Sequence, residues 1–160
     1  MDSGDNERLL GNLCWLLSQA SFGLNSELAA ALDDVGLSPR GHMVLIAAQD
    51  GGHSQAELAK LAGLDKTTMV TTVDDLERKG LARRVRHPAD RRARIIEVTA
   101  QGRRALARAD AVFDEIRRDV LSLIPAEQRA EFMANLQRLV SGRLGSASGT
   151  AQTARRRSPR

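Results

Sequence analysis

Aromatic residues are scarce in this chain of 160 residues, which has no tyrosine, three phenylalanines and one tryptophan. Proteins that bind single-stranded nucleic acid without sequence preference stack the bases on several aromatic side chains. The composition therefore argues against a binding surface of that kind.

Cysteine and histidine are also rare. The single cysteine, Cys14, excludes an intrachain disulfide and a cysteine-rich zinc site. The three histidines, His42, His53 and His87, have no histidine or cysteine three or four positions further along. Because metal-binding histidines usually have a second ligand at such a spacing, we expect no metal site and no cofactor.

Long apolar runs are absent as well. No run approaches the roughly 18 residues that a membrane span needs, so we expect no membrane partner. Residues 1–7 are acidic and lack the basic region with which a signal peptide starts. The sequence therefore predicts a cytoplasmic protein.

Motifs of catalysis are missing too. The chain has no glycine-rich phosphate loop, no Cys/His nucleophile pair and no pair of carboxylates with a positioned partner. We therefore do not expect an enzyme.

Positive charge, by contrast, is concentrated between residues 78 and 94. This segment contains eight basic residues and one acidic residue, a net charge of +7, whereas the whole chain carries +4. Residues 143–160 add five arginines and no acid. The remaining body is thus acidic, and a basic edge on an acidic body is typical of proteins that bind a polyanion.

Apolar periodicity predicts a mainly helical chain. Leucine and alanine recur every three or four positions from about residue 7 to 32, which indicates a long amphipathic first helix. Ser38 and Pro39 form a helix start, and the second helix should end near residue 49. A fifth helix begins at Thr99 with a narrow, heptad-like apolar seam, and Pro125 starts a sixth.

Two short helices between these segments form a helix-turn-helix candidate. Ser54 and Glu57 have the spacing of a capping box at the start of the third helix, and Leu61 is expected on its inner face. Gly63 stops that helix, and Asp65 can cap the fourth. The N-terminal end of the second helix of such a motif is the part that enters a DNA major groove.

The outward face of the fourth helix supplies the candidate base-contacting residues. Threonine hydroxyls bond to phosphate or base edges, and the methyl groups of threonine and valine can meet a thymine methyl group. The alternative is that the threonines are simply solvated, but threonine forms helices only moderately well, so propensity does not explain four of them. The candidates are Lys66, Thr67, Thr68, Val70 and Thr71.

A hairpin is predicted after this helix. Residues 81–86 and 94–98 alternate or contain β-branched side chains, and they flank a basic loop. Such a loop can reach an adjacent minor groove, where the negative potential favours arginine. The alternative, a solvated run of charge, is less favoured beside a helix-turn-helix. The candidate DNA-binding residues of this wing are Arg84, Arg86, Asp90, Arg91, Arg92 and Arg94.

Together these residues resemble the MarR family of winged-helix transcription factors over about residues 7–142. The resemblance is strongest in segments 56–68, 76–81, 88–93 and 98–103. Its most specific part is the Asp-x-Arg of residues 90–92 followed by the Thr-x-x-Gly of residues 99–102. The recognition helix departs from the family at Thr71 and Asp75, where a basic residue is frequent.

The resemblance implies a function and an assembly. Asp90 would be the carboxylate of the wing and Arg92 its minor-groove arginine, while the fourth helix would be the recognition helix. Family members are homodimers built from the first, fifth and sixth helices, and they bind pseudo-palindromic operators in double-stranded DNA. Many release DNA when a small aromatic ligand occupies a cleft between the dimerisation and DNA-binding lobes.

Three further residues have two interpretations each. Trp15 could line such a ligand cleft or pack at the dimer interface, and His42 could face the cleft or be a structural histidine. Some relatives sense oxidants through a cysteine in the first helix, where Cys14 lies, but a structural cysteine is the commoner case.

The sequence thus predicts a mainly α fold with a small two- or three-stranded β-wing, a winged helix-turn-helix with a helical dimerisation lobe. We expect a dimerisation region at 7–34 and 99–143, a DNA-binding domain at 38–98, and a disordered basic tail at 145–160. The expected function is a sequence-specific repressor that acts as a homodimer. The alternative is a winged-helix module for nucleoid binding without sequence preference, or for protein contacts.

Overall fold

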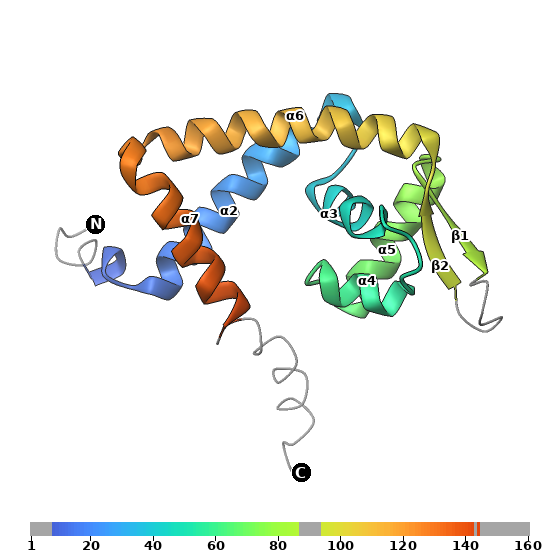
Figure 1. The fold of residues 1–160 in the computed structure, drawn as a ribbon, viewed down its shortest axis with the longest axis horizontal. Helices are drawn as coiled ribbons and strands as arrows, with labels where there is room; N and C mark the ends of the chain where they lie inside the picture. The colour runs from blue at the N-terminus through green and yellow to red at the C-terminus, as the bar shows by residue number, and fades with distance from the viewer. Residues whose placement is uncertain (1–7, 87–93, 143, 145–160) are drawn as a thin grey trace, which may run out of the picture. The chain divides into compact units, whose positions relative to one another are not determined.

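The computed structural model describes residues 8–86, 94–142 and 144 (Figure 1). The chain divides into two compact units, residues 1–116 and 117–160, and the division falls within helix α6. The described residues contain no helix long and apolar enough to cross a membrane. The predicted mainly helical fold with a small β-wing is confirmed.

The first unit begins with a helical turn at residues 8–10, followed by α2 (Leu13–Ala31). The sequence predicted one continuous helix from about residue 7, but the chain breaks at Gly11 and Asn12. The side chain of Asn12 accepts a hydrogen bond from the backbone N–H of Trp15 at 3.0 Å, so α2 starts at an N-cap of its own. Within the described chain α2 buries only Leu28.

A 3-10 turn, η1 (Asp33–Val35), leads into α3 (Pro39–Ala48). The predicted start of α3 is confirmed, because the Ser38 hydroxyl accepts from the Gly41 N–H at 3.0 Å and proline occupies the first helical position. Next come α4 (Gln55–Leu61) and α5 (Lys66–Arg78). The capping box of Ser54 and Glu57 is present at the start of α4, as predicted.

A glycine turn joins α4 to α5, and its geometry corrects one prediction. Gly63 has a φ of 64°, and the N–H of Leu64 donates to the Ala59 carbonyl at 2.8 Å, which ends α4 in a Schellman motif. This turn brings Leu64 against the core. Leu61, which was expected on the inner face, is 62% exposed, because α4 ends there and Leu64 takes the inner position.

The hairpin consists of β1 (Ala82–Arg86) and β2 (Arg94–Val98), which pair antiparallel. The register places Arg84 opposite Ile96 and Arg86 opposite Arg94. An isolated bridge between Ser54 and Ile95 attaches the hairpin to the start of α4. Together with this bridge, the two strands account for the predicted two- or three-stranded wing.

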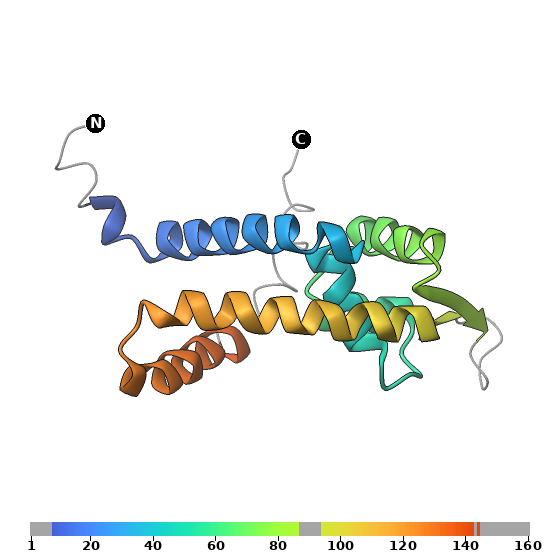
Figure 2. The ribbon, with the colours of Figure 1, turned by 90° about the horizontal axis from the view of Figure 1, so that it is seen from above.

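One hydrophobic core holds the helix-turn-helix, the hairpin and the first part of α6 together. Figures 1 and 2 show α3 and α4 lying beneath the first half of α6. Burying leucine-sized side chains stabilises a core by about 1.5–3 kcal/mol each. The largest fully buried side chains are Leu32, Leu45, Leu58, Met69, Leu76, Ile96 and Leu106.

Helix α6 (Ala100–Ser122) starts directly against the end of α5. The Thr99 hydroxyl lies 2.7 Å from the Gly80 carbonyl oxygen, to which it donates, and accepts from the Gly102 N–H at 2.9 Å. A Cβ atom on Gly102 would lie 1.9 Å from the backbone oxygen of Leu81. The Thr-x-x-Gly motif of residues 99–102 is thus the joint that fixes α6 to the end of α5.

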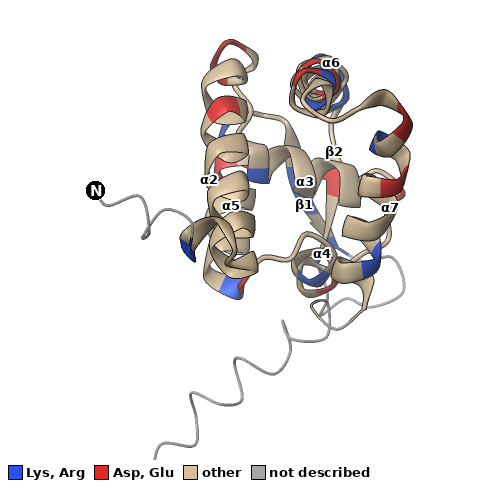
Figure 3. Cartoon of the chain, turned by 90° about the vertical axis from the view of Figure 1, so that its left-hand side faces the viewer, with Lys and Arg blue, Asp and Glu red and all other residues tan. Residues whose placement is uncertain are grey.

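Charge is mixed along α6. Figure 3 looks along this helix and shows acidic and basic residues around its circumference. Residues 100–109, at the start of α6, still carry three arginines and no acidic residue, whereas four acidic residues follow in the helix from Asp110 onward.

The second unit contains α7 (Ala126–Ser141) and, before it, the last residues of α6. The Arg129 guanidinium donates to the Ile124 carbonyl at 2.8 Å and closes the turn between the two helices. No residue of α7 is buried within the described part of the chain, although Phe132, Leu139 and Val140 are large and apolar.

Candidate nucleic-acid interface

The N-terminal end of α5 is exposed to solvent and begins with a side-chain cap. The Asp65 carboxylate accepts from the Thr68 N–H at 2.9 Å and from the Thr68 hydroxyl at 2.7 Å. These hydrogen bonds, that of the backbone first, lower the pKa of Asp65 below its ordinary value. Asp65 is therefore an ionised cap, and part of the hydrogen-bonding capacity of Thr68 is used within the helix.

The remaining predicted residues of α5 face outward. Lys66, Thr67, Val70 and Thr71 are exposed, whereas Thr68 is half-buried. The Thr71 hydroxyl donates to the Thr68 carbonyl at 3.0 Å, which leaves its oxygen lone pairs and its methyl group available. The prediction that these residues contact DNA remains a prediction, but their exposure is what such a contact requires.

The fourth threonine of α5 has a different environment. Thr72 is buried, and its hydroxyl donates to the Thr68 carbonyl at 2.7 Å. Burial of a hydroxyl group is tolerated when it has a hydrogen-bond partner. Thr72 is therefore part of the core side of the helix and is not available to a nucleic acid.

The C-terminal half of α5 carries three carboxylates, and all three have cationic partners. Asp75 pairs with Arg78 and with Lys79, the latter at 2.9 Å. Asp74 and Glu77 both pair with Arg84. Carboxylates on a recognition helix repel phosphate, so their pairing reduces the electrostatic cost of bringing this helix to DNA.

Much of the positive charge of residues 78–94 is therefore used within the protein. Arg83 on β1 donates to Glu97 on β2 at 2.8 Å, so this pair spans the hairpin. Four basic residues of this segment form ion pairs with nearby carboxylates: Arg78, Lys79, Arg83 and Arg84. The net charge of the segment, counted from the sequence, did not reveal this pairing.

Arg86 and Arg94 differ from these four residues. They are exposed and directly opposite each other in the hairpin. Within residues 8–86, 94–142 and 144, neither makes an ion pair or a hydrogen bond through its side chain. Like charges directly opposite each other destabilise an antiparallel pair, and an anion between them removes that repulsion. The described end of the hairpin thus carries two exposed positive charges side by side.

The other predicted residues of the wing, Asp90, Arg91 and Arg92, lie outside the described residues. So does the predicted basic tail at 145–160.

His42 has a specific structural environment that sequence patterns did not reveal. It is 4% exposed, its Nε2 lies 2.7 Å from a carboxylate oxygen of Asp110, and its ring stacks on Phe113 with centroids 3.9 Å apart. These contacts join α3 to α6 within the first unit. Because 68 residues separate His42 from Asp110, no local motif could have indicated the pair.

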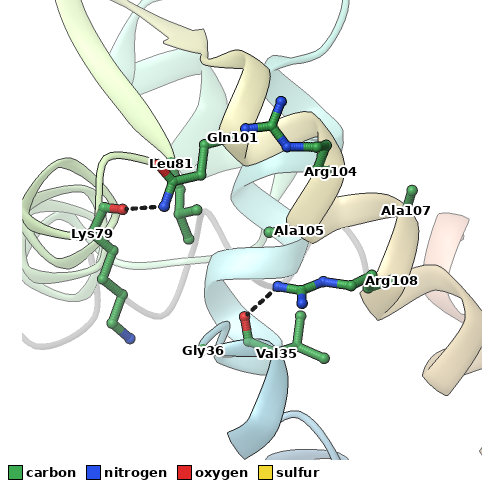
Figure 4. Close-up of a pocket in the computed structure, with 9 residues that line it drawn as sticks. All are labelled: Val35, Gly36, Lys79, Leu81, Gln101, Arg104, Ala105, Ala107 and Arg108. Carbon is green, nitrogen blue, oxygen red and sulfur yellow. Dashed lines mark hydrogen bonds between the residues drawn. The ribbon is translucent and has the colours of Figure 1, made fainter.

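The two largest cavities described in the first unit have room for a small molecule. One, of about 700 Å³, lies between η1, the end of α5 and α6 (Figure 4). In it the Gln101 amide donates to the Lys79 carbonyl at 3.3 Å, and Arg108 donates to the Val35 carbonyl at 3.4 Å. The other, of about 1110 Å³, is lined by residues of α2, α3 and α5, among them Phe22, Arg40 and Thr71.

The remaining candidates on α2 do not come together into a site. Trp15 is half-buried and Cys14 is exposed. Neither Trp15 nor His42 lines either of the two cavities. Within the described residues, no group of three or more histidine, cysteine, aspartate or glutamate side chains is placed to hold a metal ion.

A helix-turn-helix with an exposed N-terminal end on its second helix, followed by a hairpin with exposed arginines, defines the class of winged-helix DNA-binding proteins. Comparison with known protein families and solved structures places the chain within this class. Residues 35–93 match the profile of the MarR family. The chain belongs to the MarR family of winged-helix transcriptional regulators.

Solved structures agree with this assignment. The chain is 32% identical to CouR from Rhodococcus jostii RHA1 bound to p-coumaroyl-CoA, with a TM-score of 0.72, over 82% of this chain and 93% of that one. It is 32% identical to a MarR family protein from Mycobacterium tuberculosis in complex with salicylic acid, with a TM-score of 0.66, over 81% and 96% of the two chains. The transcriptional repressor CouR bound to a 23-mer DNA duplex is 27% identical, with a TM-score of 0.77, over 88% and 98%.

Proposed function

We propose that this MarR family regulator acts in the cytoplasm as a homodimeric repressor on a pseudo-palindromic operator. The observation that carries this proposal is that an exposed, threonine-rich helix end and two exposed arginines lie on one framework. Thr67, Val70 and Thr71 are exposed on α5, and Arg86 and Arg94 are opposed at the end of the hairpin. The similar repressor CouR has been seen on a DNA duplex, which supports this function.

In this proposal the two parts of the interface have different tasks. Lys66, Thr67, Thr68, Val70 and Thr71 read base edges in the major groove, while Arg86, Arg91, Arg92 and Arg94 contact the backbone and the adjacent minor groove. Asp90 holds the shape of the wing by pairing with an arginine. Phosphate contacts set affinity and register, and base contacts set the sequence preference.

The apolar residues left exposed support a dimer. On α2, Phe22 is 74% exposed, and in the second unit Leu123 is 87% exposed. Large apolar side chains exposed in this way are typical of surfaces that make protein–protein contacts. We assign residues 7–34 and 99–143 to dimerisation and residues 38–98 to DNA binding.

Selection of bound duplexes from a random pool tests the operator directly. A homodimer should enrich inverted repeats whose half-sites lie about one DNA turn, 10–10.5 base pairs, apart. If operator and scrambled duplexes bind equally well at physiological salt, the chain is a nucleoid-type module without sequence preference.

The wing is tested by Arg92→Ala, which should weaken operator binding and leave the dimer intact. Operator binding at wild-type affinity would contradict the wing assignment.

We also propose that a small aromatic ligand releases the protein from DNA. Similar proteins have been solved with p-coumaroyl-CoA and with salicylic acid. The cavity of about 1110 Å³ reaches Thr71 and Thr72 of the proposed recognition helix, so its occupant would contact that helix directly. Trp15 and His42, which the sequence predicted for the ligand site, do not line this cavity.

Thermal unfolding in the presence of these two compounds tests this proposal, because a ligand that binds only the folded state raises the melting temperature. The same compound should lower operator affinity. A compound that raises the melting temperature and leaves operator binding unchanged would exclude it as the effector.

A further inference from the structure

Arg84 has an environment unlike that of any other described arginine in the hairpin. Its side chain is 19% exposed, and each of its three guanidinium nitrogens has a protein partner. One terminal nitrogen lies 2.7 Å from an Asp74 carboxylate oxygen, the other pairs with Glu77, and Nε donates to the Gln55 side-chain oxygen at 3.2 Å.

The backbone of the same residue joins this network. The Arg84 N–H donates to the second carboxylate oxygen of Glu77 at 2.6 Å. Glu77 therefore holds both the main chain and the side chain of one residue of β1. Hydrogen bonds to an ionised carboxylate are stronger than neutral ones, and two of them from different parts of one residue also fix its orientation.

Three elements meet at this point. Gln55 is the first residue of α4, Asp74 and Glu77 lie on α5, and Arg84 lies on β1. A single guanidinium therefore connects the wing to both helices of the helix-turn-helix. Displacing it towards a phosphate group would leave Glu77, whose side chain is only 32% exposed, without its cation, and unpaired charge is costly at such a partly buried place. The more exposed Asp74 would lose its cation as well.

We propose that Arg84 is a positioning residue, which fixes the wing at one angle to the recognition helix and neutralises Asp74 and Glu77, and that it does not bind DNA phosphate. This proposal rests on the proposed DNA-binding function. It reassigns one of the arginines that the sequence pattern grouped with the DNA contacts. The free cations of the described hairpin are then Arg86 and Arg94.

The salt dependence of operator binding separates the two roles. Each lost phosphate contact reduces the slope of log K against log salt by about 0.9. Arg86→Gln, which removes an exposed cation two residues further along β1, is expected to reduce the slope by that amount per protomer. Arg84→Gln is expected to lower operator affinity by about tenfold or more and to leave the slope unchanged. The substitution disturbs the angle of the wing but removes no side chain that neutralises a phosphate group. A slope reduced as in Arg86→Gln would overturn the proposal.

Arg84→Lys provides the second test. Lysine keeps the charge but presents a single ammonium group, which cannot bond Gln55, Asp74 and Glu77 together. A phosphate contact would be restored by lysine, so near wild-type affinity and stability for Arg84→Lys would contradict the positioning role. The expected result is an unfolding midpoint in urea that stays well below that of the wild type.

Unfolding experiments decide the proposal without DNA. Arg84→Gln and Glu77→Gln combined are expected to shift the urea midpoint by less than the sum of the single shifts, since both remove the same network. Arg83→Gln, which breaks the exposed pair with Glu97 on the same strand, is the matched control and should shift the midpoint little. Additive shifts would refute the network. A wild-type protein that binds no duplex would refute the proposed function, while this comparison would still decide the role of Arg84.

Discussion

At the scale of single residues, the joint between α5 and α6 depends on the absence of a side chain at Gly102. A Cβ atom there would lie 1.9 Å from the Leu81 carbonyl oxygen, a backbone atom that already accepts from Thr99. Relief of the clash requires α6 to move away from the end of α5, and this breaks the hydrogen bonds of Thr99. The position therefore controls how the two helices are joined.

Gly102→Ala is accordingly expected to destabilise the protein by about 3 kcal/mol or more. Gly23→Ala is the matched control, because a Cβ atom at Gly23 meets nothing within 4 Å, and alanine is the better residue inside a helix by about 0.5–1 kcal/mol. Urea unfolding of the two variants checks the pair. Similar effects of the two substitutions would show that the close approach at Gly102 is unimportant.

Asp65 gives the stability of α5 a dependence on pH. The Thr68 hydrogen bonds lower the pKa of the folded-state carboxyl below 3.8, its ordinary value. The contribution of the cap is therefore fully present above that value and is lost as the pH falls through the lower folded-state pKa. Asp65→Asn keeps a capping oxygen that does not titrate in this range.

The melting temperatures of wild type and Asp65→Asn, measured between neutral pH and pH 3, should therefore converge as the pH falls. The wild type should be the more stable at neutral pH. A difference between the two proteins that does not change with pH would exclude an ionised Asp65 cap.

At the scale of elements, the two parts of the proposed interface should respond differently to substitution. Thr67→Ala removes an exposed hydroxyl and methyl group from α5, and we expect it to change the preferred base at one position of each half-site by about 1–3 kcal/mol. Arg86→Gln should weaken binding to all duplexes by a similar factor. Competition between operator variants, each changed at one base pair, measures both effects. A uniform loss for Thr67→Ala would contradict base reading by this residue.

Elements whose signals are local could be predicted from the sequence. The caps at Ser38, Ser54 and Asp65 depend on residues no more than three positions away, and all three are present. Leu61 was predicted wrongly, although the stop at Gly63 was expected, because its three-residue spacing from Leu58 does not show which side of the last turn the core covers. Gly63 ends α4 early enough for Leu64 to take the inner position.

The electrostatics of the site could not be predicted in the same way. Charge counting identified the basic segment, but the partners of Arg84 on α4 and α5 depend on the tertiary fold. Gln55 is 29 residues from Arg84, and Asp110 is 68 residues from His42. Contacts over such separations are set by packing, so a sequence pattern grouped Arg84 with Arg86 although their environments differ.

At the scale of the whole molecule, the exposed apolar side chains indicate that the protomer makes a contact with another protein chain. Phe132 lies on α7, a helix that buries nothing within the described part of the chain. Phe132→Asp should therefore leave the protomer folded and shift the dimer towards monomer. Because two linked half-site contacts bind far more tightly than one, operator affinity should fall by about 100-fold or more.

Sedimentation equilibrium measures the oligomeric state in this experiment, and Glu131→Ala, a change at an exposed polar neighbour, is the control. A Phe132→Asp protein that stays dimeric would place the interface elsewhere. A monomer that binds the operator as tightly as the wild type would refute the proposed two-half-site mode.

On α5, the residues that hold the structure differ from the residues that are exposed, and this affects how the regulator can change the operator that it prefers. Asp65, Thr68 and Thr72 maintain the helix, and Asp74 and Glu77 hold the wing. Thr67 and Val70, by contrast, are exposed and have no packing role in the core. New side chains at these two positions cost little folding stability, so operator preference can evolve, or be redesigned, on a scaffold that stays the same.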